Sequence, residues 1–346
     1  MAGMKRLALL LAAAAALLPG AAHDAACSPL NCAPSQFSLA GGTMLGFRTA
    51  IDKPVRVVDL RTGKTRWTLP AGFEAGNTLV HQASYELVWT NAATDRRVAT
   101  SAYPGGFQLV GVSQDGRRAV LQDGSTFAIV SPHAVRKLRL PGGSWQFDAL
   151  QGDNLFAIRY LKTGGYQVRL VKVGTGRVVA HVLKDVIWGA PFARLSSPDG
   201  QYLFTLYVGA NGAAMIHELN LRSAAAKCID LPGTGDFGAA STWAMALSRD
   251  GKTLWAVSPG YQRAVGIDVA TRNPTSAFSI DLPYWNTGTT PAAVLAPDGT
   301  HLALADGETV AVVDLDARKL VSRTRGRAQA LGYSPDGTHL WRLKTS

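Results

Sequence analysis

Apolar residues in this chain either alternate with polar ones or form short runs, and helical periodicity is hard to find. The runs are bounded by Gly, Pro, Asp and Asn, as at 202–204 (Tyr-Leu-Phe) and 253–255 (Thr-Leu-Trp). Short apolar segments between turn residues predict β-strands rather than helices. The chain is therefore expected to be all-β.

A turn phrase recurs through the sequence. An Asp side chain accepts hydrogen bonds from its own backbone, and Gly adopts the positive φ of a tight turn, so each copy predicts a turn between two strands. A second phrase, 55–60 followed by Thr-Gly-Lys at 62–64, has relatives at 168–173, 265–269 and 310–315. The turn phrase reads Ser-Pro-Asp-Gly at 197–200 and 334–337, Ser-Arg-Asp-Gly at 248–251 and Ala-Pro-Asp-Gly at 296–299, with weaker copies at 113–116 and 151–154.

Together the two phrases predict a repeat of four antiparallel strands. At about 44 residues per unit, residues 41–346 hold seven blades of a β-propeller, with six or eight as alternatives. The unit at 328–343 has only its first two strands, while 55–69 supplies later strands near the other end. We therefore expect a terminal blade shared by both chain ends, which removes open sheet edges. A further strand-like run at 44–49 complicates this expectation.

The recurring turns and the phrase at 57–64 (Val-Val-Asp-Leu-Arg-Thr-Gly-Lys) resemble bacterial YVTN-type and tryptophan-aspartate-like β-propellers. The resemblance covers most of residues 40–346 and is strongest after about residue 195. It implies a fold and not an activity, because such propellers host lactonases, dehydrogenases, protease-linked domains and pure binding scaffolds.

The first 22 residues read as a signal peptide. Lys5 and Arg6 precede an apolar run at 7–18 that is too short to span a bilayer, and small residues follow at 20–22. Cleavage is expected after Ala22, with Ala26 as second choice. The protein is then exported: extracellular, periplasmic or associated with the cell envelope. No later run of apolar residues is long enough for a transmembrane segment.

Residues 23–40 form an N-terminal segment with two of the three cysteines. Export permits disulfides, and Cys27 and Cys32 are close enough in sequence to close a small loop. Cys228 is then free and is most simply a small buried residue. A lipid anchor on Cys27 is the alternative, although Asp24 stands where a lipobox needs a residue like Leu.

The formal net charge of +11 fits solubility or attraction to anionic envelope polymers. Its basic residues are scattered singly or in pairs, so we predict no nucleic-acid partner. Residues 233–238 match G-x-G-x-x-G but lack a following helical pattern, so this segment is interpreted as a loop. The histidines are isolated, and no catalytic motif, cofactor site or metal-ligand spacing is present.

The predicted function is binding or scaffolding by a monomeric protein. Its predicted partner is a protein or an envelope polymer, bound at one propeller face. The alternative is a lactonase-like hydrolase with a metal in the central channel. Three connections at 188–194, 236–243 and 284–290 are rich in aromatic and hydroxyl groups and occur at one repeat phase. Aromatic anchors among small polar residues suit binding; packing between blades is the competing interpretation. The candidate contacts are Trp188, Phe192, Phe237, Trp243, Tyr284 and Trp285.

Overall fold

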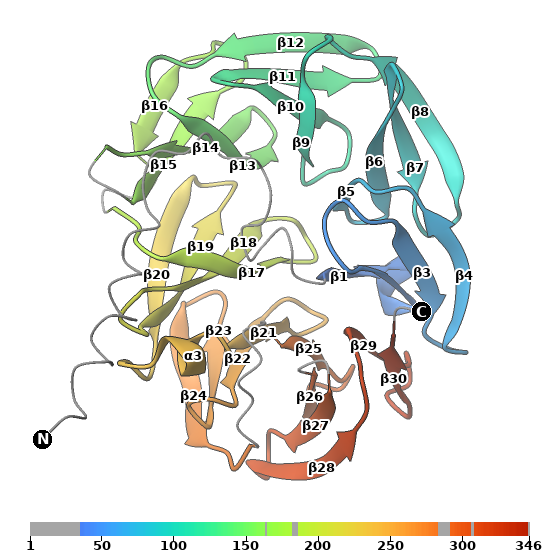
Figure 1. Ribbon diagram of the computed structural model, residues 1–346, viewed down its shortest axis with the longest axis vertical. Helices are drawn as coiled ribbons and strands as arrows, with labels where there is room; N and C mark the ends of the chain where they lie inside the picture. The colour runs from blue at the N-terminus through green and yellow to red at the C-terminus, as the bar shows by residue number, and fades with distance from the viewer. Residues whose placement is uncertain (1–34, 163–164, 182–185, 283–290, 306–307, 345–346) are drawn as a thin grey trace, which may run out of the picture.

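The computed structural model describes residues 35–344 except 163–164, 182–185, 283–290 and 306–307. It consists of seven four-stranded antiparallel sheets and one two-stranded sheet, arranged as a ring (Figure 1). The predicted all-β fold with seven four-stranded propeller blades is confirmed.

Each blade follows chain order from its first to its fourth strand. Of the two short helices in the described residues, one lies in a turn of the first blade and the other in a connection between blades. The elements of the first four blades are β1(Ser35–Leu39), η1(Ala40–Gly42), β2(Met44–Arg48), β3(Val55–Asp59), β4(Lys64–Leu69); β5(Phe73–Ala75), β6(Thr78–Ala83), β7(Glu86–Asn91), β8(Arg96–Ala102); β9(Gln108–Val112), β10(Ala119–Asp123), β11(Thr126–Ser131), β12(Ala134–Arg139); β13(Trp145–Gln151), β14(Asn154–Tyr160), β15(Tyr166–Lys172), β16(Val178–His181). The remaining elements are β17(Ala190–Ser196), β18(Tyr202–Val208), β19(Ala214–Asn220), β20(Ala225–Leu231); α3(Phe237–Ala240); β21(Ala244–Leu247), β22(Thr253–Ser258), β23(Arg263–Asp268), β24(Asn273–Ser279); β25(Ala292–Leu295), β26(His301–Ala305), β27(Thr309–Asp314), β28(Lys319–Arg325); and the hairpin β29(Ala330–Tyr333), β30(Leu340–Leu343).

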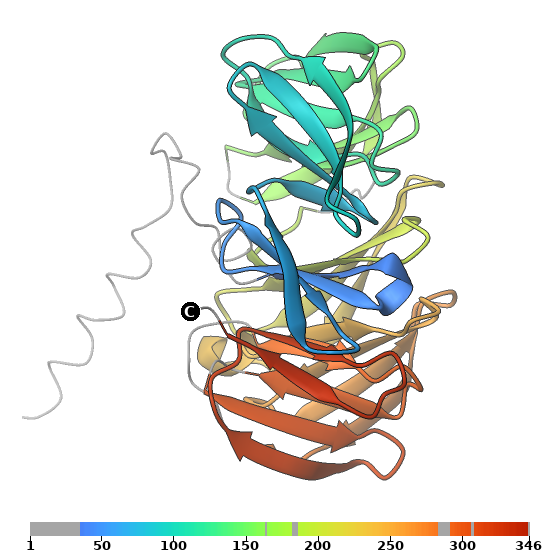
Figure 2. The same cartoon turned by 90° about the vertical axis from the view of Figure 1, so that its right-hand side faces the viewer.

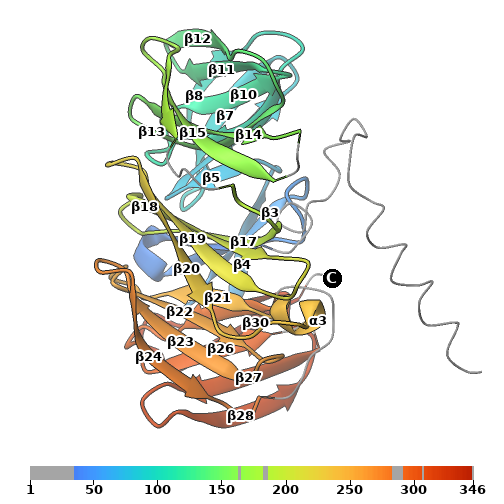
Figure 3. The ribbon, with the colours of Figure 1, turned by 90° about the vertical axis from the view of Figure 1, so that its left-hand side faces the viewer.

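The antiparallel order divides the connections between two faces of the ring. Turns from first to second and from third to fourth strands lie on one face, which we call the turn face. Turns from second to third strands and the connections between blades lie on the other, the connection face. Figures 2 and 3 show this division: α3 and the C-terminal end lie on one side of the disc, and η1 lies on the opposite side.

The core lies between the blades, where neighbouring sheets pack face to face. One cluster joins Phe204 and Ile216 of the fifth blade to Leu254 and Ile267 of the sixth. Alternation explains the sequence pattern, because every second side chain of the middle strands enters one of two interblade layers. Middle strands such as β14 and β18 are therefore apolar along most of their length.

The recurring turn phrase is explained by one hydrogen-bond network. At 197–200 the Ser197 hydroxyl donates to Asp199 Oδ1 and accepts from the Tyr202 amide, while Asp199 also accepts from the Gln201 amide. Gly200 has φ 66°, which suits a residue without Cβ. The hydroxyl of Ser197 and the backbone donor hold the pKa of Asp199 below its usual value. The same contacts recur at 113–116, 248–251 and 334–337.

The ring closes differently from the expected shared blade. The segment at 35–48 supplies β1 and β2, so the first blade takes all four strands from one end of the chain. The hairpin β29–β30 forms its own two-stranded sheet and packs between the seventh blade and the first. The two chain ends thus meet by side-chain packing instead of strand pairing. The expectation failed because β1 begins at Ser35, before the predicted domain boundary at residue 41.

Two side chains fasten this closure. Gln36 Nε2 donates to the Ala293 carbonyl of β25, and Gln36 Oε1 accepts from the Leu331 amide of β29. On the other side of the hairpin, Trp341 donates from Nε1 to the Leu60 carbonyl at 2.5 Å. A Cβ on Gly63 would lie 2.5 Å from the Trp341 ring, so glycine permits the close approach. No helix in the described part of the chain is long and apolar enough to cross a membrane.

Candidate functional site

The predicted contact loops at 188–194 and 236–243 belong to the connection face, because each joins the fourth strand of one blade to the first strand of the next. The segment with Tyr284 and Trp285 lies outside the described residues, as do Cys27 and Cys32. The other four predicted residues, Trp188, Phe192, Phe237 and Trp243, are placed by the structure and divide into two pairs.

Phe192 and Trp243 are core residues. Their exposed fractions are 6% and 0%, and both lie in the hydrophobic cluster between the fifth and sixth blades. The Trp243 ring lies 6.3 Å from that of Tyr261. A partner cannot reach either side chain in this conformation, so we assign them to blade packing.

Trp188 and Phe237 are accessible, with exposed fractions of 57% and 46%. Phe237 leans on buried Phe192, with ring centroids 5.9 Å apart. Two exposed aromatics on the same face escaped the sequence reasoning: Tyr160, at the end of β14, and Tyr85, in the turn between β6 and β7. The signal that could have found them is their repeat phase, since both end a second strand or follow one.

Tyr160, Trp188 and Phe237 follow one another around the fourth and fifth blades, and we call them the aromatic arc. Tyr160 packs on Tyr166 with ring centroids 6.0 Å apart. A Cβ on Gly165 would lie 3.3 Å from the Trp188 ring, so Trp188 covers the turn that follows Tyr160. The four large exposed hydrophobics of the described residues that are not aromatic, Val98, Val135, Val179 and Val321, lie instead on outer strands.

Charged residues are concentrated on the turn face, opposite the aromatic arc. The turns of the turn face carry an aspartate in nearly every unit, often beside an arginine, whereas the described connections between blades contain few charged residues, such as Asp236, Asp281 and Arg327. Depletion of charge together with exposed aromatics is characteristic of the core of a protein interface. The aspartates of the turns between first and second strands are Asp115, Asp153, Asp199, Asp250, Asp298 and Asp336.

A buried ion pair lies beneath the arc, between the fourth and fifth blades. Asp148 is at a bulge in β13 and Arg194 follows a bulge in β17. Arg194 Nη2 donates to Asp148 Oδ1, and Nη1 donates to the Asp148 carbonyl at 3.1 Å. The Asp148 side chain is 4% exposed and that of Arg194 is 26% exposed. The pair thus links the inner strands of the fourth and fifth blades.

Tyr166, Tyr207 and His217 surround the ion pair. The Tyr207 ring lies 5.7 Å from that of Tyr166 and 6.2 Å from that of His217. Burial raises the pKa of both tyrosines. Burial also lowers the pKa of His217, and the Asp148 charge offsets part of that lowering. These three groups are therefore neutral at pH 7. They are enclosed, so the cluster is suited to structure rather than to substrate chemistry.

The buried cluster also supports the arc above it. Tyr166 and Ile187 exchange backbone hydrogen bonds of 3.1 Å and 2.9 Å, and Trp188 follows directly. These two hydrogen bonds restrain the backbone next to Trp188. This restraint reduces the conformational entropy that Trp188 loses when a partner binds.

Residues 233–236 form a loop, as interpreted from sequence, but the short helix α3 begins at Phe237, where no helical pattern was expected. A Cβ on Gly233 would lie 2.7 Å from the Tyr261 ring. Asp236 caps the four-residue helix α3 by accepting from the Ala239 amide, and the Tyr261 hydroxyl donates to the carbonyls of Gly212 and Asp236. These contacts tie the loop to the fifth blade through Gly212 and to the sixth blade through Tyr261.

The histidines that share a repeat position share a contact as well. The Thr300 hydroxyl lies 2.7 Å from His301 Nδ1, and the Thr338 hydroxyl lies 2.7 Å from His339 Nδ1. Their recurrence reflects repeat copying. Within the described residues, no three His, Cys, Asp or Glu side chains come together in a way that could hold a metal ion.

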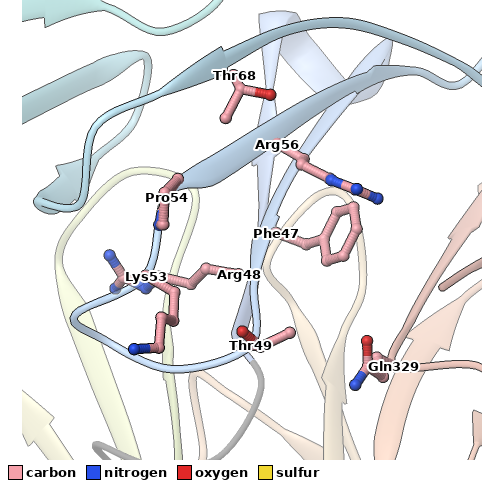
Figure 4. Close-up of a pocket in the computed structure, with 8 residues that line it drawn as sticks. All are labelled: Phe47, Arg48, Thr49, Lys53, Pro54, Arg56, Thr68 and Gln329. Atoms are coloured by element: carbon pink, nitrogen blue, oxygen red, sulfur yellow. The ribbon is translucent and has the colours of Figure 1, made fainter. Parts of the chain in front are cut away.

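A hollow of about 630 Å³ lies at the connection-face end of the first blade (Figure 4). Arg48, Lys53 and Arg56 line it together with Phe47 and Gln329. Figure 4 shows Arg48 and Phe47 pointing to opposite sides of β2. Arg48 is 3% exposed and donates hydrogen bonds to the Ser35 hydroxyl, the Gly72 carbonyl and the Glu74 carboxylate, so its role is structural.

Comparison with known proteins identifies the fold only. No protein-family model and no curated protein matches the chain. Among solved structures, dihydro-heme d1 dehydrogenase NirN in complex with DHE aligns with a TM-score of 0.52 at 16% identity, over 85% of this chain and 66% of that chain. Kuenenia stuttgartiensis hydrazine synthase aligns with a TM-score of 0.47 at 15% identity, over 86% and 96%, and Kluyveromyces lactis Hsv2 with 0.49 at 12%, over 84% and 98%.

Proposed function

We propose that this β-propeller is a binding module that holds a protein partner on its connection face, with Tyr160, Trp188 and Phe237 as contacts. The observation that carries the proposal is the gathering of exposed aromatic side chains on one face whose connections are poor in charge. Large, rigid aromatic side chains supply contact area at a low entropy cost and are enriched among binding hot spots.

We also propose that the protein is exported. The charged, apolar and small-residue pattern of residues 1–22 supports export, and the recurring turns support kinship with YVTN-type propellers. A disulfide between Cys27 and Cys32 stays a prediction that depends on export. Intact-mass analysis of the protein recovered outside the cytoplasm tests export and the disulfide: a chain beginning at His23 and lighter by two hydrogens supports both, and an uncleaved or lipid-modified chain opposes them.

Replacing Trp188 and Phe237 together by Ser should abolish partner binding while leaving folding intact. Both side chains are about half exposed, so their loss costs little stability, whereas a central aromatic contact contributes about 2 kcal/mol or more to binding. The measurement is quantitative recovery of proteins from envelope extract on immobilised wild type and variant, followed by affinity measurement with the protein recovered.

The matched control is Val135→Ser with Val321→Ser, two exposed apolar residues on outer strands away from the connection face. The control should bind as the wild type does. Equal loss of binding in both double variants, or none in either, would place the partner elsewhere.

A further inference from the structure

The two-stranded sheet β29–β30 occupies a place in the ring between two complete blades. Within the described residues, β30 pairs only with β29, and no third strand lies against its outer side. In each of the seven blades the second strand is covered on both sides by neighbouring strands. The outer edge of β30 is therefore a strand edge of the kind that other chains can pair with.

Hydrogen-bond alternation shows which backbone groups face outward. The Leu331 amide points to Gln36 and away from β30, so its partner Arg342 belongs to a pair without mutual backbone bonds. The Ser334 amide donates to the His339 carbonyl, which independently fixes the same alternation. The N–H and C=O groups of Leu340 and Arg342 thus point away from β29. At the next outward position, the Lys344 carbonyl already accepts a bond from Arg56 Nη1 at 3.0 Å.

Hollows flank this sheet on both sides. The hollow of about 630 Å³ lies toward the first blade, where Phe47, Arg56 and Thr68 form one cross-strand row. A second hollow of about 270 Å³ lies toward the seventh blade and is lined by Val312, Tyr333 and Leu340 among others. Successive side chains of an added strand point to opposite sides, so they would enter the two hollows in turn.

The outer strands beside the gap are basic, although carboxylates lie nearby: Asp59 pairs with Arg66, Asp52 pairs with Lys53, and Asp298 lines the second hollow. The outer strands on its two sides are β4, with Lys64 and Arg66, and β28, with Lys319, Arg323 and Arg325, and neither strand contains an acidic residue. Exposed Arg342 lies on β30 itself. Basic outer strands complement an acidic partner.

We propose that an acidic, extended segment of a partner protein adds to β30 as an antiparallel third strand. Its backbone pairs with Leu340 and Arg342, and its acidic side chains on one side face Arg56 and Lys53. Main-chain bonds supply affinity in such strand addition, and the side-chain pockets supply specificity. This site is separate from the aromatic arc and does not depend on it.

The test uses a short blocked peptide in which Thr and Glu alternate, with a Thr and Lys peptide as its counterpart. Titration calorimetry should show binding of the acidic peptide only. Arg342→Pro removes one outward N–H and is compatible with an edge strand, whereas Arg342→Ala keeps that N–H. Arg342→Pro should lower the affinity for the acidic peptide at least about tenfold relative to Arg342→Ala.

A second variant avoids any backbone effect. Arg56→Glu should lose the acidic peptide, while Arg222→Glu, an equal charge change at an exposed turn-face residue, should keep most of the affinity. Equal binding by Arg342→Pro and Arg342→Ala, or equal binding of the two peptides, would overturn the proposal. So would occupation of the β30 edge in the free protein by residues 23–34, seen as slow amide exchange at Leu340 and Arg342.

Discussion

Replacing Arg194 by Met should lower the free energy of unfolding by about 3 kcal/mol or more. The substitution leaves the buried Asp148 carboxylate without its ion-pair partner. It also removes the hydrogen bond that Arg194 donates to the Asp148 carbonyl. Removing one member of a buried pair is far costlier than replacing both, because a lone buried charge has lost its hydration. Urea unfolding followed by tryptophan fluorescence measures the change.

The control for this effect is Arg222→Met, which removes an exposed arginine and should change stability by no more than about 0.5 kcal/mol. Asp148→Leu combined with Arg194→Met should recover much of the loss, since the unpaired charge is then gone. If Arg194→Met costs no more than Arg222→Met, the pair does not hold the fourth and fifth blades together.

Trp341→Ala should also destabilise the protein strongly, by about 3 kcal/mol. Trp341 fills the space over Gly63, donates to the Leu60 carbonyl and belongs to the cluster that joins the hairpin to the first blade. Loss of a large packed aromatic leaves a cavity at the one place where the ring is closed by packing rather than by a connection along the chain. Thermal unfolding of the variant gives the shift.

Trp188→Ala is the matched control, because it deletes the same side chain where it is 57% exposed. We expect a change within about 0.5 kcal/mol. A Trp341→Ala protein as stable as Trp188→Ala would mean that the hairpin contributes little to closure.

The repeated turns made the fold predictable. Ser197, Asp199 and Gly200 are local chemistry: their hydrogen bonds involve residues close in sequence, so each turn can be inferred without knowing the rest of the chain. Six copies of this turn along the chain then leave few alternatives to a propeller. The interior of the blades follows from strand alternation in the same way.

Ring closure and the candidate site were harder to predict from the sequence, because both depend on contacts between residues far apart in the chain. Gln36 reaches β25 and β29 from the far end of the sequence, and nothing local to it announces those partners. Trp243 and Trp188 occur at similar repeat positions, yet one is enclosed by the next blade and the other is not. Exposure of an aromatic in a connection depends on how adjacent blades stagger, which is a property of the assembled ring.

Residue-resolved amide hydrogen exchange along β29 and β30 tests most directly whether the ring holds seven complete blades and an open-edged hairpin. We expect slow exchange for Trp341 and Leu343, whose amides face β29, and fast exchange for Leu340 and Arg342, whose amides face outward. Uniform protection of all four amides would contradict this expectation, because a third strand would then already cover the edge.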